Sequence, residues 1–195
     1  MISVFNIKEG LVIGLLQLNK FAEVNNLNQK REIETKGKQY LINHLLNKEI
    51  EIQYDENGKP YLLNEYKHIS ITHSHDKIAI IINDFEKTGI DIELIRDKVL
   101  KIKHKFLAES ELINAENDPE KLLIYWGAKE SLYKIYGLKE VDFIKNLYIN
   151  AFIKNHSGTI VGNINMTNFN KSYELAYLKI EEYMLVYSLK EISAC

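Results

Sequence analysis

The chain is poor in the residues that mark several common classes of protein. Among its 195 residues the only cysteine is Cys195, so an internal disulfide framework and paired-cysteine metal sites are excluded. It has only two prolines, and no Pro- or Ser-rich linker divides it. Its nine glycines include neither the Walker phosphate-binding pattern nor the dinucleotide-binding fingerprint, and the Gly-x-Ser-x-Gly of a hydrolase nucleophile is missing. Other chemistry must be sought.

Basic charge and long apolar runs are also lacking. A net charge of −2 gives no basic footprint, so we expect no nucleic-acid partner. The longest apolar stretches, near residues 11–18 and 78–82, are far shorter than the roughly 20 residues that span a bilayer, so we expect no membrane partner. The first residues lack the basic segment and cleavage site of an export signal. We therefore expect a cytoplasmic protein.

What is present is a 46% hydrophobic chain with alternating strand and helix patterns, enough to bury a core. The first half predicts one helix over residues 28–47 and a turn at Asn57-Gly58. Its expected strands cover residues 2–7, 11–18, 49–54, 68–72 and 77–82, and a further strand is expected at residues 88–94, where the second half begins.

The second half predicts helices first and strands afterwards. Residues 98–117 have a largely helical pattern, and Pro119 begins a further helix that ends near Tyr136, before Gly137. Strands follow within residues 146–189, including 172–180 and 183–189. Because helices and antiparallel strands mix in each half, we predict an α+β fold with an N-terminal half at residues 1–86 and a C-terminal half at 87–195 that carries the candidate metal site.

Two carboxylates alternate with isoleucines in Gly89-Ile90-Asp91-Ile92-Glu93. On a strand, Asp91 and Glu93 point to one face and the isoleucines to the other. Such a pair suits a divalent cation, because hard cations prefer oxygen ligands. The other interpretation is the solvated face of an amphipathic strand, and the spacing alone leaves both open.

The segment Trp126-Gly127-Ala128-Lys129-Glu130-Ser131-Leu132-Tyr133-Lys134 is the second notable pattern. Glu130 and Lys134 lie one helical turn apart, as in an ordinary ion pair worth roughly 0.2–0.5 kcal/mol. Alternatively, Glu130 joins Asp91 and Glu93 at a metal, and Lys134 neutralises a phosphate. Lys129 adds a cation nearby, although its side chain is rotated by about 100° from that of Glu130.

Candidate phosphate-binding groups lie in the first half. Lys59 lies at a Gly-Lys-Pro turn, and His73 follows Thr72 at a strand end. A partly protonated imidazole suits an anion. Arg31 and Lys38 lie on the first predicted helix, where a solvated face is the alternative. No role is expected for four other histidines, His44, His68, His104 and His156.

Taken together, four segments of the chain resemble the 4′-phosphopantetheinyl transferase superfamily. These are Asn57-Gly58-Lys59-Pro60-Tyr61-Leu62, Ile69-Ser70-Ile71-Thr72-His73-Ser74 and the two carboxylate-bearing segments quoted above. The length resembles the larger class, in which one chain folds as an intramolecular pseudo-dimer of two similar α+β halves. Such a chain is expected to be a monomer.

The resemblance implies transfer of 4′-phosphopantetheine from coenzyme A to a serine of an apo acyl or peptidyl carrier protein. Adenosine 3′,5′-bisphosphate is the other product. By motif, Asp91, Glu93 and Glu130 would hold Mg²⁺, with Glu130 or a water taking the serine proton. Lys134 would neutralise phosphate charge.

In the first half, the resemblance implies that His73, Thr72 and Lys59 contact coenzyme A. Thr72 replaces the family's serine and keeps a hydroxyl. Relatives often carry an arginine on the first helix for the 3′-phosphate, where this chain offers Lys38, or else Arg31; a lysine there lacks the bidentate guanidinium. A non-catalytic relative that only binds coenzyme A or a carrier protein is the alternative function.

Overall fold

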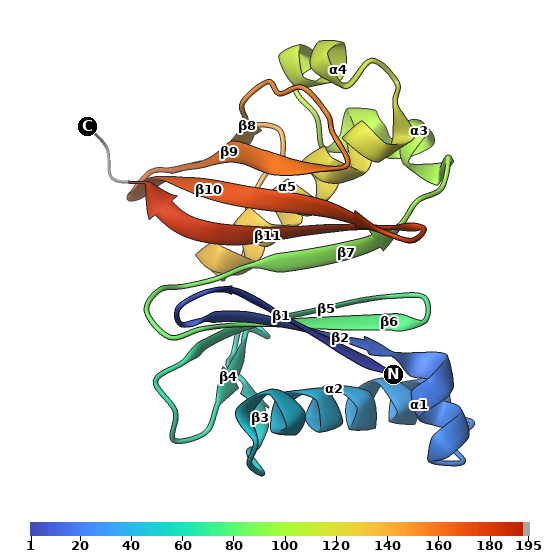
Figure 1. Ribbon diagram of the computed structural model, residues 1–195. Helices are drawn as coiled ribbons and strands as arrows, with labels where there is room; N and C mark the ends of the chain where they lie inside the picture. The colour runs from blue at the N-terminus through green and yellow to red at the C-terminus, as the bar shows by residue number, and fades with distance from the viewer. Residues whose placement is uncertain (193–195) are drawn as a thin grey trace. The chain divides into compact units, whose positions relative to one another are not determined.

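The computed structural model describes residues 1–192, so Cys195 lies outside the described residues. The chain divides into two compact units, residues 1–87 and residues 88–195. The first unit contains a four-stranded antiparallel sheet in the order β1-β2-β6-β5 (Figure 1). Its strands are β1 (Ile2–Lys8), β2 (Leu11–Gln17), β5 (His68–Ser74) and β6 (Lys77–Asn83).

Two helices accompany this sheet, α1 (Leu18–Val24) and α2 (Lys30–Leu46). α2 lies along one face, where Leu41 and Ile42 pack against the fully buried side chains of β6. A short hairpin of β3 (Ile52–Tyr54) and β4 (Pro60–Leu62) follows α2. Asp55 Oδ1 accepts hydrogen bonds from the backbone N–H groups of Asn57 and Lys59, which holds the turn expected at Asn57-Gly58.

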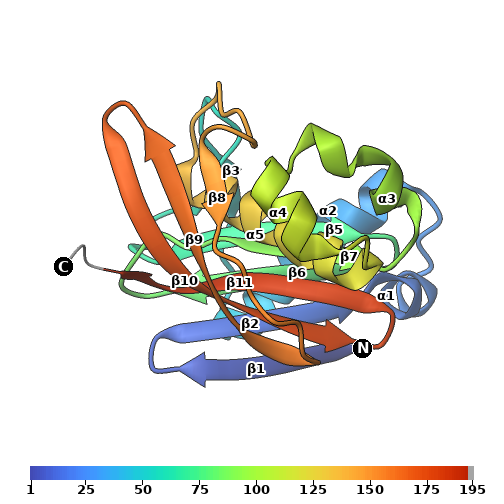
Figure 2. The same cartoon turned by 90° about the horizontal axis from the view of Figure 1, so that it is seen from above.

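The second unit contains a five-stranded antiparallel sheet in the order β7-β11-β10-β9-β8. Its strands are β7 (Ile90–Leu94), β8 (Leu147–Ile149), β9 (Ser157–Met166), β10 (Phe169–Ile180) and β11 (Tyr183–Ile192). The long helix α5 (Pro119–Tyr136) packs on β7 and β11. Beside it, on the same face, lie α3 (Lys98–Ile102), the 3-10 turn η1 (Lys103–Lys105) and α4 (Glu109–Ala115) (Figure 2).

Local sequence explains why α5 has these ends. Asp118 accepts hydrogen bonds from the backbone N–H groups of Glu120 and Lys121, and Pro119 occupies the first helical position. Gly137 ends the helix with φ of +72°, a conformation that glycine adopts without strain. Between these ends, fully buried residues such as Leu122, Ile124, Leu132 and Ile135 join the core of the unit. The helix is therefore fixed along its whole length.

The mixed α+β class and the antiparallel strand pairing are confirmed. Two local expectations were wrong. The strand predicted at residues 11–18 ends at Gln17, because Leu18 begins α1 and is buried against Phe21 and α2. The helix predicted over residues 98–117 is broken after η1, where Phe106 and Leu107 turn into the core. No helix among residues 1–192 is both long enough and apolar enough to cross a membrane.

Candidate active site

The centre of the candidate site is the contact between β7 and α5 in the second unit. Asp91 is only 5% exposed, and its Oδ1 accepts a hydrogen bond of 2.9 Å from Lys134 Nζ. The same ammonium donates to the carbonyl oxygen of Ile90 at 2.7 Å. Lys134 therefore binds both the backbone and a carboxylate of β7.

Two glycines, one from each motif, allow this close approach. A Cβ on Gly89 would lie 2.0 Å from the backbone oxygen of Ser131 on α5. A Cβ on Gly127 would lie 2.8 Å from a methyl group of Val186 on β11 and 3.6 Å from Asp91 Oδ2. The first contact involves rigid backbone, so only glycine fits there. The motif glycines thus set the distance between α5 and the sheet.

Glu130 lies on α5 in the field of the other candidate site residues. Burial raises its pKa to about 7; the negative charge of Asp91 adds to this, Lys134 opposes it, and Glu93 raises it further. Three carboxylates and one ammonium therefore lie within electrostatic reach of one another. Such a concentration of negative charge favours a bound cation.

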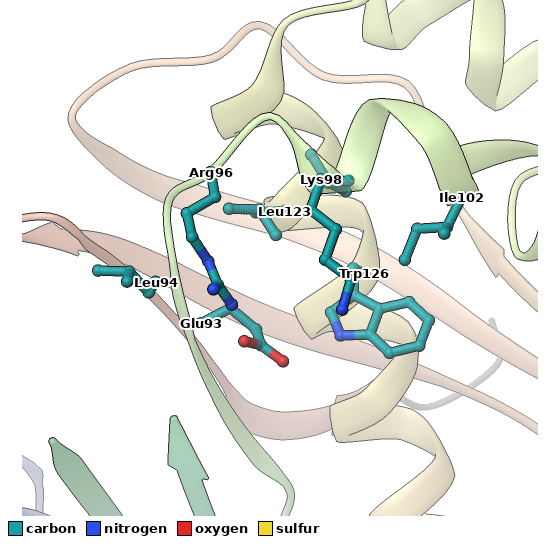
Figure 3. A pocket seen from close by; sticks show the side chains of 8 residues that line it. Glu93, Leu94, Arg96, Lys98, Ile102, Leu123 and Trp126 are labelled. Carbon is teal, nitrogen blue, oxygen red and sulfur yellow. The ribbon is translucent and has the colours of Figure 1, made fainter. Parts of the chain in front are cut away.

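A cavity of about 240 Å³ adjoins this group and is lined by Glu93, Arg96, Lys98 and Trp126. Figure 3 shows the side chains of Arg96 and Lys98 extending into the cavity, toward Glu93 and Trp126. Apolar side chains complete the lining, namely Leu94, Val99, Ile102 and Leu123. Glu93 thus belongs both to the carboxylate group and to a cavity with two cationic side chains, which the sequence did not predict.

The donor chemistry of this group fits a hard divalent cation. Asp91, Glu93 and Glu130 offer oxygen ligands, and Mg²⁺ usually takes one or two carboxylates, completing its shell with water and phosphate. Among residues 1–192, however, no group of three or more His, Cys, Asp or Glu side chains is arranged to hold a metal ion by itself. The protein would therefore supply part of a coordination shell.

Lys129 does not join the site, contrary to the expectation of a nearby cation. Its side chain is fully buried, and its Nζ donates to Glu111 Oε2 at 2.6 Å and to the carbonyl oxygens of Phe106 and Phe143, each at 2.8 Å. The 100° rotation from Glu130 turns Lys129 into the core of the unit. Its partner Glu111 lies on α4.

The predicted coenzyme A contacts of the first half all lie in the first unit. His73 is half exposed at the end of β5, with Nδ1 3.9 Å from Glu34 Oε1 on α2, and Thr72 beside it is buried. Lys38 of α2 donates a 3.2 Å hydrogen bond to the hydroxyl of Tyr54. Arg31 is exposed in the first turn of α2.

Lys59 has cationic neighbours that sequence reasoning missed. Burial and the charge of Lys87 lower the pKa of Lys59, while Asp55 opposes the shift. Burial, Lys59 and Lys87 likewise lower the pKa of His68. Repulsion among cations indicates a position suited to an anion. The signal was undetectable in the sequence, because the three residues lie on different segments and share no motif.

The region that carries this site resembles a known protein family. Comparison with curated proteins gave no match. The family model ACPS, 4′-phosphopantetheinyl transferase superfamily, matches residues 87–188, more than half of the chain. The matched region contains β7, α5 and the first part of β11, and hence Asp91, Glu93, Glu130 and Lys134. The chain therefore belongs to the 4′-phosphopantetheinyl transferase superfamily.

Proposed function

We propose that this protein transfers the 4′-phosphopantetheine group of coenzyme A to a serine of an apo acyl or peptidyl carrier protein. The main support is that one unit, matched by the family model, gathers Asp91, Glu130 and Lys134 at the contact between β7 and α5. The chemistry needs positioning and charge neutralisation rather than a covalent intermediate, and these side chains suit that need.

In the proposed reaction the serine oxygen attacks the β-phosphorus of the coenzyme A diphosphate. A new phosphorus–oxygen bond forms to serine, and the bond to the bridging oxygen breaks. Adenosine 3′,5′-bisphosphate leaves with that oxygen. The serine proton passes to Glu130, directly or through a water. In the metal-free protein burial raises the pKa of Glu130 to about 7, and a bound Mg²⁺ would lower it and keep the carboxylate ionised to accept the proton.

Asp91, Glu93 and Glu130 are the proposed ligands of Mg²⁺. The metal ion, when bound, would neutralise charge on the diphosphate. Lys134 would approach the phosphates as a second positive charge. Because Lys134 also bonds to Asp91, the same ammonium would orient a metal ligand.

In the first unit, His73, Thr72 and Lys59 are the proposed contacts to coenzyme A. Lys38 or Arg31 would hold the 3′-phosphate. His68 and Lys87 extend this proposal, since the charge of Lys87 lowers the pKa of both Lys59 and His68. We place the chain in the larger class, in which the halves at residues 1–86 and 87–195 form an intramolecular pseudo-dimer, and propose that it acts as a cytoplasmic monomer.

The test uses the full chain, coenzyme A, Mg²⁺ and apo carrier proteins from fatty-acid, polyketide and peptide synthesis. Intact mass spectrometry should show a gain of one phosphopantetheine on at least one carrier, lost when a chelator removes the metal. Asp91→Ala and Glu130→Ala should abolish the gain. Binding of coenzyme A in calorimetry without transfer to any carrier would instead favour the non-catalytic relative.

A further inference from the structure

A buried ion pair joins Lys129 and Glu111 within the second unit. The distance between Lys129 Nζ and Glu111 Oε2 is 2.6 Å, and neither side chain has any exposed surface. Lys129 lies on α5, three residues after Trp126 and directly before Glu130. A charged pair removed this completely from water is costly unless its hydrogen bonds are satisfied.

Every hydrogen-bond donor of the Lys129 ammonium has an acceptor. An ammonium has three N–H groups, and Glu111 Oε2 and the carbonyl oxygens of Phe106 and Phe143 accept from Nζ at 2.6, 2.8 and 2.8 Å. Glu111 in turn accepts from two backbone N–H groups, those of Ala108 at 2.8 Å and Ile149 at 2.9 Å. The pair therefore connects α5 with α4, with the segment between η1 and α4, with the segment before β8, and with β8.

The carbonyl oxygens that accept from Lys129 belong to Phe106 and Phe143, whose rings both contact Trp126. The Phe106 ring meets Trp126 edge-on with centroids 5.0 Å apart, and the Phe143 ring lies 5.8 Å from it. Phe143 also lies 5.8 Å from Tyr133. One ammonium thus binds the backbone of both phenylalanines whose rings contact the indole.

Trp126 connects this cluster to the candidate site. It lines the cavity that also contains Glu93 (Figure 3). On α5, Trp126, Lys129 and Tyr133 follow the spacing i, i+3 and i+7, which aligns them along one face. Glu130 and Lys134 belong to the neighbouring face of the same rigid helix. A displacement of the Lys129 face would therefore move both the cavity wall and the candidate base.

We propose that Lys129 and Glu111 are positioning residues, which hold Trp126 and the Glu130 turn of α5 in the geometry needed for transfer. This inference rests on the proposed function for its kinetic part only. The competing interpretation is a pair that stabilises the fold and nothing else. The two differ because an apolar or neutral pair can restore stability without restoring the hydrogen bonds to Phe106 and Phe143.

The test compares the wild-type protein with Glu111→Gln and with the double variant Lys129→Met/Glu111→Gln, which removes both buried charges together. Lys121→Met is the matched control, since Lys121 is also a buried lysine of α5 but lies 5.6 Å from the Phe152 ring centroid, away from Trp126 contacts. Because Trp126 is the only tryptophan, its fluorescence reports the cluster directly, without any need for activity.

We expect the double variant to unfold cooperatively but to show red-shifted Trp126 emission and stronger quenching by acrylamide. Its kcat for transfer should fall about tenfold or more, while KM for coenzyme A changes less than about threefold. Glu111→Gln should show the same changes to a smaller degree, and Lys121→Met should retain wild-type emission and kcat.

Wild-type emission and kcat in the double variant would overturn the proposal, as would equal losses in Lys121→Met. If the double variant does not fold, unchanged Trp126 emission and kcat in Glu111→Gln would overturn it. Failure of the proposed function has a different signature: the wild-type protein transfers nothing to any carrier. In that case unchanged Trp126 fluorescence in the variants would still refute positioning of the indole.

Discussion

Lys134 reaches from α5 to β7 and donates two hydrogen bonds to that strand, one to the carboxylate of Asp91 at 2.9 Å and one to the backbone carbonyl of Ile90 at 2.7 Å. Asp91 is only 5% exposed, so Lys134 places a positive charge beside a buried carboxylate. The lysine proposed to neutralise phosphate therefore also fastens the helix to the strand. Its replacement should affect both stability and transfer.

Lys134→Met should lower the free energy of unfolding by about 1–3 kcal/mol, because it removes charge-assisted hydrogen bonds to a buried carboxylate. Urea denaturation at pH 7 measures this. The control is Lys139→Met, since Lys139 is exposed just beyond the end of α5 and should change stability by less than about 0.5 kcal/mol. Equal stability of Lys134→Met and wild type would show that the pair contributes nothing to the contact between α5 and β7.

Glu130 should make the metal-free protein less stable as the pH rises. Its folded pKa of about 7 exceeds the ordinary 4.5, first because it is buried and next because Asp91 is near. The folded state therefore binds the proton more tightly, and stability falls between about pH 4.5 and pH 7, then levels off. Relative to Glu130→Gln, wild type should lose on the order of 1–3 kcal/mol across this range.

Thermal or urea unfolding at pH 5 and pH 8, with a chelator present, tests this dependence. Glu182→Gln serves as the control, because Glu182 is exposed in the turn between β10 and β11. A wild-type protein that gains stability from pH 5 to pH 8 relative to Glu130→Gln would contradict the sign. The two proteins should be most alike at pH 5, where Glu130 is mainly protonated.

Mg²⁺ should restore the stability that the metal-free protein loses at high pH. Binding to the folded state alone stabilises it, by about 2.7 kcal/mol at a free concentration of 100 times Kd. For a chain of this size each kcal/mol raises the melting temperature by roughly 2–4 °C. We expect Mg²⁺ to raise it at pH 8 in wild type, and less in Glu130→Gln or Asp91→Asn. A gain of the same size in all three proteins would exclude both residues as ligands.

The elements that carry the site were predictable because their signals are local. Alternation over residues 89–93 indicated β7, and Pro119 with Gly137 marked the ends of α5. The carboxylates Asp91 and Glu93 were recognisable candidates from the motif in which they occur. A strand or helix of this kind is specified by neighbours within a few residues of one another.

The contacts of Lys129 and Lys59 were not predictable in the same way. Lys129 has Glu111 as its charged partner, 18 residues upstream, and its other acceptors are backbone carbonyls, which no residue type reveals. The charge of Lys87 lowers the pKa of Lys59, and the charges of Lys59 and Lys87 lower the pKa of His68. These effects depend on proximity in the folded structure alone. The break after η1 was missed for a related reason, because burial of Phe106 and Leu107 overrides the helical pattern.

The two motif glycines should differ sharply in their tolerance of alanine. At Gly89 the new Cβ would lie 2.0 Å from the backbone oxygen of Ser131, so α5 or β7 must move. At Gly127 the nearest atoms are a methyl group of Val186 at 2.8 Å and its Cβ at 3.1 Å, so the crowding is against a side chain rather than the backbone and needs a smaller displacement. Alanine also favours a helix interior over glycine by up to about 1 kcal/mol, which offsets part of the crowding at Gly127.

Gly89→Ala should therefore cost at least about 2 kcal/mol of stability and abolish transfer, whereas Gly127→Ala should remain within about 1 kcal/mol of wild type. Urea unfolding measures the first effect and intact mass of the carrier the second. Mg²⁺ should no longer stabilise Gly89→Ala, even under conditions in which this variant is folded, because displacement of α5 separates Glu130 from Asp91. Equal tolerance of alanine at both positions would show that the distance between helix and sheet is not set by Gly89, and that the backbone contact relaxes without affecting the carboxylates.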